Sequence, residues 1–96
     1  MVETVIVTGC SQGVGLGIAS VYLRDGAQVV GCDRNPAPEI LAGSKNYVHV
    51  TGDVTDPVVV EQVMSTCIER YGRIDTLVNN AGVGNGHPFE QTSNED

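Results

Sequence analysis

Near its start the chain reads Val5-Ile6-Val7-Thr8-Gly9-Cys10-Ser11-Gln12-Gly13-Val14-Gly15-Leu16-Gly17-Ile18-Ala19, which predicts a buried strand, a glycine turn and the beginning of a helix. Three β-branched residues in a row are typical of a strand covered on both faces, as in a parallel sheet. Gly9, Gly13 and Gly15 allow positive φ angles and remove Cβ atoms that would hold a ligand away from the backbone. The helix that follows would point its free N–H groups and the positive end of its dipole into the turn. The stretch therefore predicts a site for a phosphate or pyrophosphate group.

The spacing of these glycines leaves other interpretations open. It is Gly-x-x-x-Gly-x-Gly rather than the commonest dinucleotide-binding motif, Gly-x-Gly-x-x-Gly, and the sequence lacks the Gly-Lys-Ser/Thr of a P-loop, so an ordinary strand-to-helix turn is one alternative. Residues 9–13 also spell Gly-x-Ser-x-Gly, the nucleophile elbow of the α/β-hydrolases, and Asp75 and His87 follow Ser11 in the order of a triad. That elbow needs an oxyanion-hole loop from an earlier strand, and only a few residues precede this one. A serine hydrolase using Ser11 is therefore the lesser alternative.

Length and composition narrow the class of protein. The chain has 96 residues, which is at most one domain, and a formal charge of −7. This charge argues against nucleic acid and anionic membrane surfaces as partners. No apolar run reaches membrane-spanning length, and the first predicted strand begins within a few residues of Met1, which leaves no room for a signal peptide. We therefore expect a cytoplasmic protein.

The cysteines and the strand histidine suggest no metal site. The three cysteines match no zinc or Cys-x-x-Cys pattern. Cys32 and Cys67 are expected to act as small buried apolar groups. Cys10 lies in the glycine turn, and we interpret it as a residue chosen for its small size. A reactive thiol at Cys10 is the alternative interpretation. We interpret His49 as a histidine on the surface of a strand rather than a ligand.

The rest of the chain alternates strands and helices. We expect a first strand over 3–8, a helix over 13–25 that ends at Gly26, a strand over 28–33, a short helix before Gly43, a strand over 46–50, a helix between an Asp56 N-cap and Gly72, and a strand over 75–78. Helical spacing predicts the core faces of the two long helices: Val14, Ile18, Val21 and Tyr22 in the first, and Val60, Val63, Met64, Cys67, Ile68 and Tyr71 in the second. This alternation predicts an α/β fold with a doubly wound parallel sheet of strand order 3-2-1-4. Ligands bind such sheets outside the carboxyl ends of the strands, where the glycine turn would lie.

An acidic residue, Asp33, closes the second predicted strand eighteen residues after Gly15. In a nucleotide-binding βαβ unit, an acid at this position accepts hydrogen bonds from the adenosine ribose hydroxyls. A 2′-phosphate would face this carboxylate, and at roughly 4 Å one unit-charge pair near the surface costs about 4 kcal/mol. Asp33 therefore predicts NAD over NADP. Arg34 could receive a 2′-phosphate if Asp33 turned away, and a solvated acid at a strand end is the plainer alternative.

The last residues carry a helix-start signal. Thr92-Ser93-Asn94-Glu95 forms a Thr-x-x-Glu capping box, and the sequence ends one residue later. We therefore expect the chain to be a piece of a longer protein. On its own it would be marginally stable or aggregation-prone, because the fourth strand would present an open apolar edge.

Four motifs in order, at matching spacing, resemble the short-chain dehydrogenase/reductase family. They are Thr8-Gly9-x-x-x-Gly13-Val14-Gly15, Asp33 after the second strand, Asp53-Val54 after the third, and Asn79-Asn80-Ala81-Gly82 after the fourth. The resemblance spans residues 1–96 and implies the N-terminal, cofactor-binding part of a single Rossmann domain, truncated before the catalytic part. It implies that Gly9, Ser11, Gln12, Gly13, Val14 and Gly15 line the cofactor phosphates and ribose, that Asp33 holds the adenosine ribose, that Asp53 and Val54 flank the adenine, and that Asn80, Ala81 and Gly82 approach the nicotinamide-side ribose. Asn79 is expected to brace the sheet.

The resemblance also implies an activity. It points to an NAD(H)-preferring oxidoreductase that transfers hydride to or from an alcohol or carbonyl substrate, with this chain as its cofactor half and a homo-oligomer as the full-length form. The family's Tyr-x-x-x-Lys pair, the preceding Ser and a catalytic Asn have no counterpart here, and Tyr22, Tyr47 and Tyr71 lack a lysine four residues on. No catalytic residue is therefore assigned, and His87 and Pro88 receive no role. A non-catalytic nucleotide-binding module is the alternative.

Overall fold

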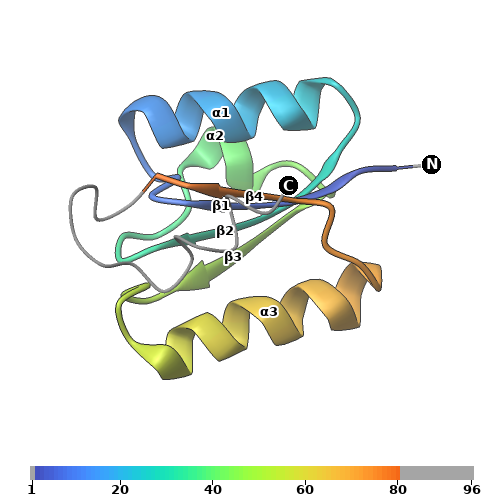
Figure 1. Ribbon diagram of the computed structural model, residues 1–96. Coiled ribbons are helices and arrows are strands. Elements are labelled where there is room, and N and C mark those ends of the chain that lie inside the picture. The colour runs from blue at the N-terminus through green and yellow to red at the C-terminus, as the bar shows by residue number, and fades with distance from the viewer. Residues whose placement is uncertain (1, 81–96) are drawn as a thin grey trace.

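The computed structural model describes residues 2–80, which form one four-stranded parallel sheet with helices on both faces (Figure 1). The elements in chain order are β1 (Thr4–Thr8), α1 (Gly13–Arg24), β2 (Gln28–Asp33), α2 (Glu39–Ala42), β3 (Tyr47–Thr51), α3 (Pro57–Tyr71) and β4 (Thr76–Asn79). Each predicted element is present, with bounds that differ by a residue or so. The predicted α/β class and the strand order 3-2-1-4 are confirmed, since the sheet runs β3-β2-β1-β4 with every pair parallel.

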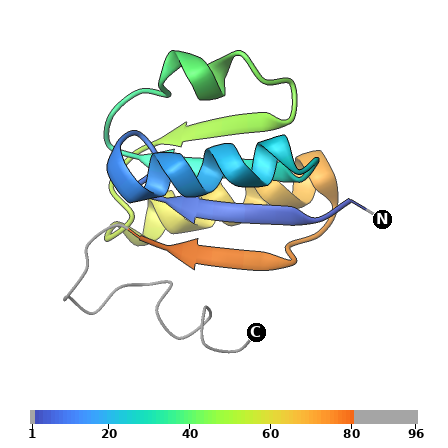
Figure 2. The ribbon, with the colours of Figure 1, turned by 90° about the horizontal axis from the view of Figure 1, so that it is seen from above.

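The two faces of the sheet carry separate halves of the core. α1 and α2 cover one face and α3 covers the other, as Figures 1 and 2 show. Val5 and Val7 of β1 pack with the α1 side, whereas Ile6 between them packs with the α3 side. All five residues of β1 are buried. The run of β-branched residues in β1 therefore reflects a central strand that is covered on both faces.

The ends of the helices follow the local signals in the sequence. The Asp56 carboxylate accepts a hydrogen bond from the Val58 N–H at 3.0 Å, and Pro57 occupies the first turn of α3. α3 ends at Gly72, which has a φ of 77°, and α1 is followed by Gly26 with a φ of 93°. These left-handed positions suit glycine, so each helix stops where the sequence predicts.

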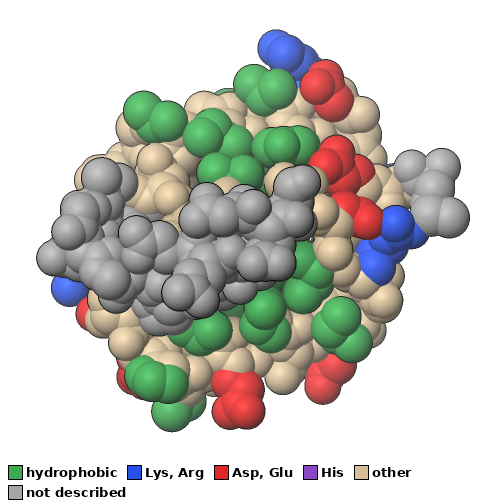
Figure 3. Space-filling model, in the orientation of Figure 1, with side chains coloured by type: hydrophobic (Ala, Val, Ile, Leu, Met, Phe, Trp, Pro, Cys, Tyr) green, Lys and Arg blue, Asp and Glu red, His purple; other side chains and the backbone are tan. Residues whose placement is uncertain are grey.

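The predicted face of α1 is right for Ile18 and Tyr22, which pack against the core, and wrong for Val14 and Val21. The fully buried side of α1 holds the small residues Gly15 and Ala19, whereas Val14 is 69% exposed and Val21 is 44% exposed. Helical spacing finds a stripe of large apolar residues, but the small residues allow α1 to approach the sheet closely and so decide which side packs. Val14 and Val21 instead border an open apolar groove beside Val78 of β4. Figure 3 shows hydrophobic side chains gathered on this part of the surface.

The core face of α3 is predicted more accurately. Val63 and Cys67 are completely buried, and Val60, Met64 and Tyr71 pack against them. Ile68 is the exception, because 51% of it is exposed although it shares the helical spacing.

Over the described part of the chain, no helix has the length and apolar character needed to cross a membrane.

Candidate functional site

The glycine turn between β1 and α1 lies at the carboxyl end of the sheet, and each motif glycine has a distinct structural reason. Gly9 and Gly13 have φ angles of 67° and 61°, a region that side chains rarely adopt. Gly15 is needed for space, since a Cβ there would collide with the Gly9 carbonyl oxygen and lie 2.8 Å from the side-chain nitrogen of Asn80. The Gly9 N–H donates to the Cys32 carbonyl at 2.8 Å, which ties the turn to β2.

The N-terminus of α1 opens onto this turn. Gln12 is the N-cap residue with an extended backbone, and its side chain makes no capping hydrogen bond. The first turn of α1 holds no acidic residue, and Gly13 adds no side chain that could cover it. The N–H groups of the first turn therefore have no side-chain cap and can bind an anion, assisted by the helix dipole.

Asp33 at the end of β2 faces the same turn. Its Oδ2 accepts a hydrogen bond from the Ser11 N–H at 3.1 Å, and its Oδ1 accepts one from the Asn35 N–H at 2.9 Å. A carboxylate has about four acceptor positions, so two remain for the hydroxyl groups of a ligand. Arg34 lies 3.9 Å from the Asp53 carboxylate, and both side chains are largely exposed, so this ion pair contributes little to stability.

The end of β4 braces the turn from the other side. The Thr8 hydroxyl donates to the Asn79 side-chain oxygen at 3.2 Å, which agrees with a bracing role for Asn79. The Asn80 N–H donates to the Thr8 hydroxyl at 2.9 Å, and the Asn80 amide nitrogen donates to the Gly9 carbonyl at 3.3 Å. Asn80 therefore touches the glycine turn. Ala81 and Gly82, the other two residues implied at the nicotinamide side, lie outside the described residues.

The two residues implied at the adenine differ in their surroundings. Asp53 accepts hydrogen bonds from the N–H and the hydroxyl of Thr55, at 2.9 Å and 2.7 Å, in the turn that follows β3. Val54 is only 5% exposed and packs in the core between the sheet and α3. The side chain of Val54 is therefore mainly a core group, a role that the motif does not reveal.

The geometry argues against the serine hydrolase alternative. The Ser11 hydroxyl donates to the backbone carbonyls of Pro36 and Asn35, at 3.0 Å and 3.3 Å. Asp75 accepts from the Thr4 N–H at 2.8 Å, at the beginning of β1, whereas Ser11 lies beyond the end of β1. Asp75 therefore lies at the amino ends of the strands, whereas Ser11 lies at their carboxyl ends. A hydrogen bond from Arg73 contributes most to a lowered Asp75 pKa, and His87 lies outside the described residues.

A partly buried hydrogen-bonded group beneath the turn was missed by sequence reasoning. The Cys10 Sγ lies 3.1 Å from the Tyr47 Oη, and the Tyr47 Oη lies 2.6 Å from the His49 Nδ1. His49 is partly exposed on β3, as expected of a strand-surface histidine, and its ring also bonds Tyr47, which the sequence reading did not anticipate. Burial raises the pKa of Cys10 and of Tyr47, which argues against a reactive thiol at Cys10. Two signals in the sequence could have indicated this group. Tyr47 and His49 are two residues apart and so share one face of β3, and Gly31 lies beside them in β2.

Comparison with known proteins places the chain among dehydrogenases. The model of the short chain dehydrogenase family matches residues 3–96. The short chain dehydrogenase adrF of Penicillium roqueforti is 42% identical over 80 residues, which are 82% of this chain and 31% of that protein. The 3-ketoacyl-(acyl-carrier-protein) reductase of Brucella melitensis complexed with NADH superposes with a TM-score of 0.79 at 29% identity, over 85% of this chain and 35% of that chain. A variant of actinorhodin polyketide ketoreductase with NADPH superposes with a TM-score of 0.72 at 35% identity, over 88% of this chain and 35% of that chain.

The matched region is a part of each relative. The chain spans between 31% and 42% of the length of the first curated relatives that it matches. Within that part, the family match begins before β1 and continues past the end of β4. Because the match covers nearly every residue, the chain belongs to the short-chain dehydrogenase family.

Proposed function

We propose that the chain binds a nicotinamide dinucleotide, NAD(H) in preference to NADP(H), and forms the cofactor-binding half of an oxidoreductase acting on an alcohol or carbonyl compound. The observation that carries the proposal is the 3.1 Å hydrogen bond from the Ser11 N–H to Asp33, which holds a carboxylate beside an uncapped helix N-terminus. A diphosphate fits the N–H groups of the turn, and a ribose diol fits the carboxylate. The site thus has partners for two chemically different parts of adenosine diphosphate.

The preference for NAD(H) rests on the charge beside the ribose position. A 2′-phosphate next to Asp33 would be repelled, and even a third of the roughly 4 kcal/mol of an unrelaxed near-surface pair corresponds to about tenfold in affinity. Arg34 is the nearby cation that could offset this repulsion, and its guanidinium lies 3.9 Å from the Asp53 carboxylate. The two structural neighbours carry NADH in one case and NADPH in the other, so the choice in this chain depends on its own residues.

The described residues are suited to binding and orienting rather than to proton transfer. The nicotinamide ring supplies the hydride chemistry when bound. Tyr47 is buried and engaged with Cys10 and His49, and burial raises its pKa, which is the opposite of what a tyrosine acid–base catalyst needs near neutral pH. We therefore propose that the glycine turn and Asn80 orient the phosphates and the adjacent ribose, while Asp33 selects the adenosine ribose.

A titration with NADH and NADPH tests the proposal. Nicotinamide fluorescence and calorimetry on the full chain should give a preference for NADH of at least about tenfold. Asp33→Asn removes the charge with little change of shape and should bring the two affinities close together. Asp25→Asn is the matched control, because Asp25 is an exposed acid at the opposite end of α1, and it should leave both affinities unchanged.

Three outcomes would contradict parts of the proposal. Tighter binding of NADPH by the unaltered chain would refute the role of Asp33. Failure to bind either dinucleotide would refute the site itself. Dinucleotide binding with no oxidoreductase activity in the whole protein, over a panel of alcohols and carbonyl compounds, would favour the non-catalytic module.

A further inference from the structure

A chain of hydrogen bonds runs beneath the glycine turn from Cys10 to the loop after β2. Cys10 is fully buried and Tyr47 is 8% exposed. Their Sγ and Oη atoms lie 3.1 Å apart, the Tyr47 Oη lies 2.6 Å from the His49 Nδ1, and the His49 Nε2 lies 2.9 Å from the Asn35 carbonyl oxygen. Three elements, the turn, β3 and the loop after β2, are therefore joined by side chains that the dinucleotide motif does not include.

The Asn35 carbonyl at the end of this series of hydrogen bonds indicates which group donates in each bond. The Asn35 carbonyl can only accept, so the His49 Nε2 must carry a hydrogen. In the neutral ring the Nδ1 is then an acceptor and takes its hydrogen bond from the Tyr47 hydroxyl. The Tyr47 oxygen is left to accept from the Cys10 thiol. With the imidazole neutral, this arrangement of hydrogens satisfies every member and directs the Tyr47 hydroxyl at His49.

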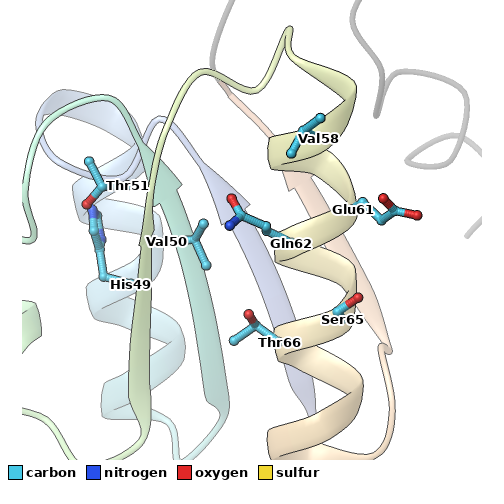
Figure 4. A pocket seen from close by; sticks show the side chains of 8 residues that line it. All are labelled: His49, Val50, Thr51, Val58, Glu61, Gln62, Ser65 and Thr66. Carbon is cyan, nitrogen blue, oxygen red and sulfur yellow. The ribbon is translucent and has the colours of Figure 1, made fainter.

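The space for these side chains comes from Gly31. Gly31 of β2 pairs with His49 of β3. A Cβ at Gly31 would collide with the Tyr47 hydroxyl and lie 2.6 Å from the Cys10 Sγ. Figure 4 shows the side chains of His49 and Val50 leaving β3 toward opposite faces of the sheet, with Val50 toward α3 and His49 away from it. The hydrogen-bonded group therefore lies on the α1 and α2 side, on the same face of β2 as Asp33.

Both oxygens of the Asp33 carboxylate accept hydrogen bonds from segments that this group joins. Asn35 accepts from His49 through its carbonyl and donates through its N–H to the Asp33 Oδ1. Ser11, which follows Cys10 in the turn, donates its N–H to the Asp33 Oδ2, and its hydroxyl lies 3.0 Å from the Pro36 carbonyl and 3.3 Å from the Asn35 carbonyl in the loop after β2. The carboxylate is thus held between two backbone segments, and the Tyr47–His49 pair links those segments from below.

We propose that Tyr47 and His49 are positioning residues for the adenosine half of the cofactor site: they hold the turn and the Asn35 loop at the separation that aims the Asp33 carboxylate. This inference rests on the proposed dinucleotide function. It predicts that loss of the pair weakens dinucleotide binding through contacts to adenosine diphosphoribose, without any contact between Tyr47 or His49 and the nicotinamide.

The test compares Tyr47→Phe, His49→Gln and the double variant by calorimetry with NADH and with ADP-ribose, which lacks the nicotinamide. Each single variant should lose about three- to tenfold in affinity, the worth of one hydrogen bond, and the same factor should appear for both ligands. The double variant should lose little more than either single variant, because the two residues act through one another. Tyr71→Phe is the matched control, since the Tyr71 hydroxyl is buried without a hydrogen-bond partner, and it should change neither affinity.

Thermal unfolding of each variant separates positioning from general stability. A lowered melting temperature with unchanged affinities in the folded protein would overturn the inference, and so would losses that multiply in the double variant. His49 is only partly buried, so His49→Gln provides the affinity measurement even if Tyr47→Phe lowers the folded fraction. If the unaltered chain binds neither NADH nor ADP-ribose, the proposed function fails and this inference fails with it; if it binds both and the variants bind equally well, only this inference fails.

Discussion

Replacing Gly15 with alanine should separate α1 from the glycine turn. The new Cβ would collide with the Gly9 carbonyl oxygen, lie 2.7 Å from the Gly9 carbonyl carbon and lie 2.8 Å from the Asn80 side-chain nitrogen. Ordinary carbon contacts need about 3.5 Å, so the helix must move by roughly 1 Å. Two of the three atoms belong to the backbone and cannot rotate away, which places the cost near the upper end of the about 1–3 kcal/mol typical of overpacking. Alanine regains about 1 kcal/mol of helix propensity, so we expect a net loss of about 2 kcal/mol.

Gly17→Ala is the matched control on the same helix. A Cβ at Gly17 would have no neighbour within 4 Å, so this variant should gain about 0.5–1 kcal/mol from helix propensity alone. Urea unfolding measures both free energies, and calorimetry with NADH measures binding. The displaced N–H groups of Gly15→Ala should lower NADH affinity at least about tenfold, the worth of one hydrogen bond to a charged group. If Gly15→Ala matches Gly17→Ala in stability and in NADH affinity, the argument from close packing is refuted.

Two further predictions concern the opposite face of the sheet and the thiols. Val63→Ala should cost about 2–3 kcal/mol because Val63 is completely buried, whereas Ile68→Ala should cost less than about 1 kcal/mol because Ile68 is 51% exposed; equal losses in urea unfolding would contradict the core assigned here. Burial raises the pKa of Cys32 from 9.0 to about 12, so below pH 9 the thiol is neutral in both states, and above it only the unfolded chain ionises. The free energy of unfolding should therefore fall as the pH rises from about 9 toward about 12, and Cys32→Ala should make that fall shallower; an unchanged slope would count against the burial of this thiol.

The sequence predicts those features whose causes lie within a few residues. The ends of α3 follow from the Asp56 cap, Pro57 and the left-handed Gly72, each of which acts on its own turn of helix. The run of β-branched residues in β1 indicates burial on both faces, because a strand with one solvent-exposed face would alternate apolar and polar residues. The placement of Asp33 beside the glycine turn follows in the same way, since parallel neighbouring strands end at one edge of the sheet.

Other features depend on partners far away in the chain and have no local signal. Spacing predicts the Val14 and Val21 face of α1 as core, but the choice of face is made by the small residue Gly15, which packs against the Gly9 carbonyl. Val54 belongs to the family motif after β3, yet its side chain is buried under α3. Spacing therefore assigns Val14 and Val21 to the wrong environment, and the family motif does not reveal that the Val54 side chain is a core group.

Gly31 shows most clearly how a residue can depend on a partner far away in the chain, and it bears on the proposed cofactor site. Gly9 and Gly13 are recognisable because their positive φ angles belong to a turn whose spacing repeats in many proteins. Gly31 sits inside a strand, where glycine ordinarily weakens the sheet, and its value comes from the Tyr47 hydroxyl on the neighbouring strand. That hydroxyl in turn orders His49 and Asn35 around Asp33. In our proposal, the Asp33 carboxylate that favours NAD(H) is therefore aimed with the help of Gly31, a glycine outside the Gly-x-x-x-Gly-x-Gly stretch, and the motif residues alone do not include the group that holds the carboxylate in place.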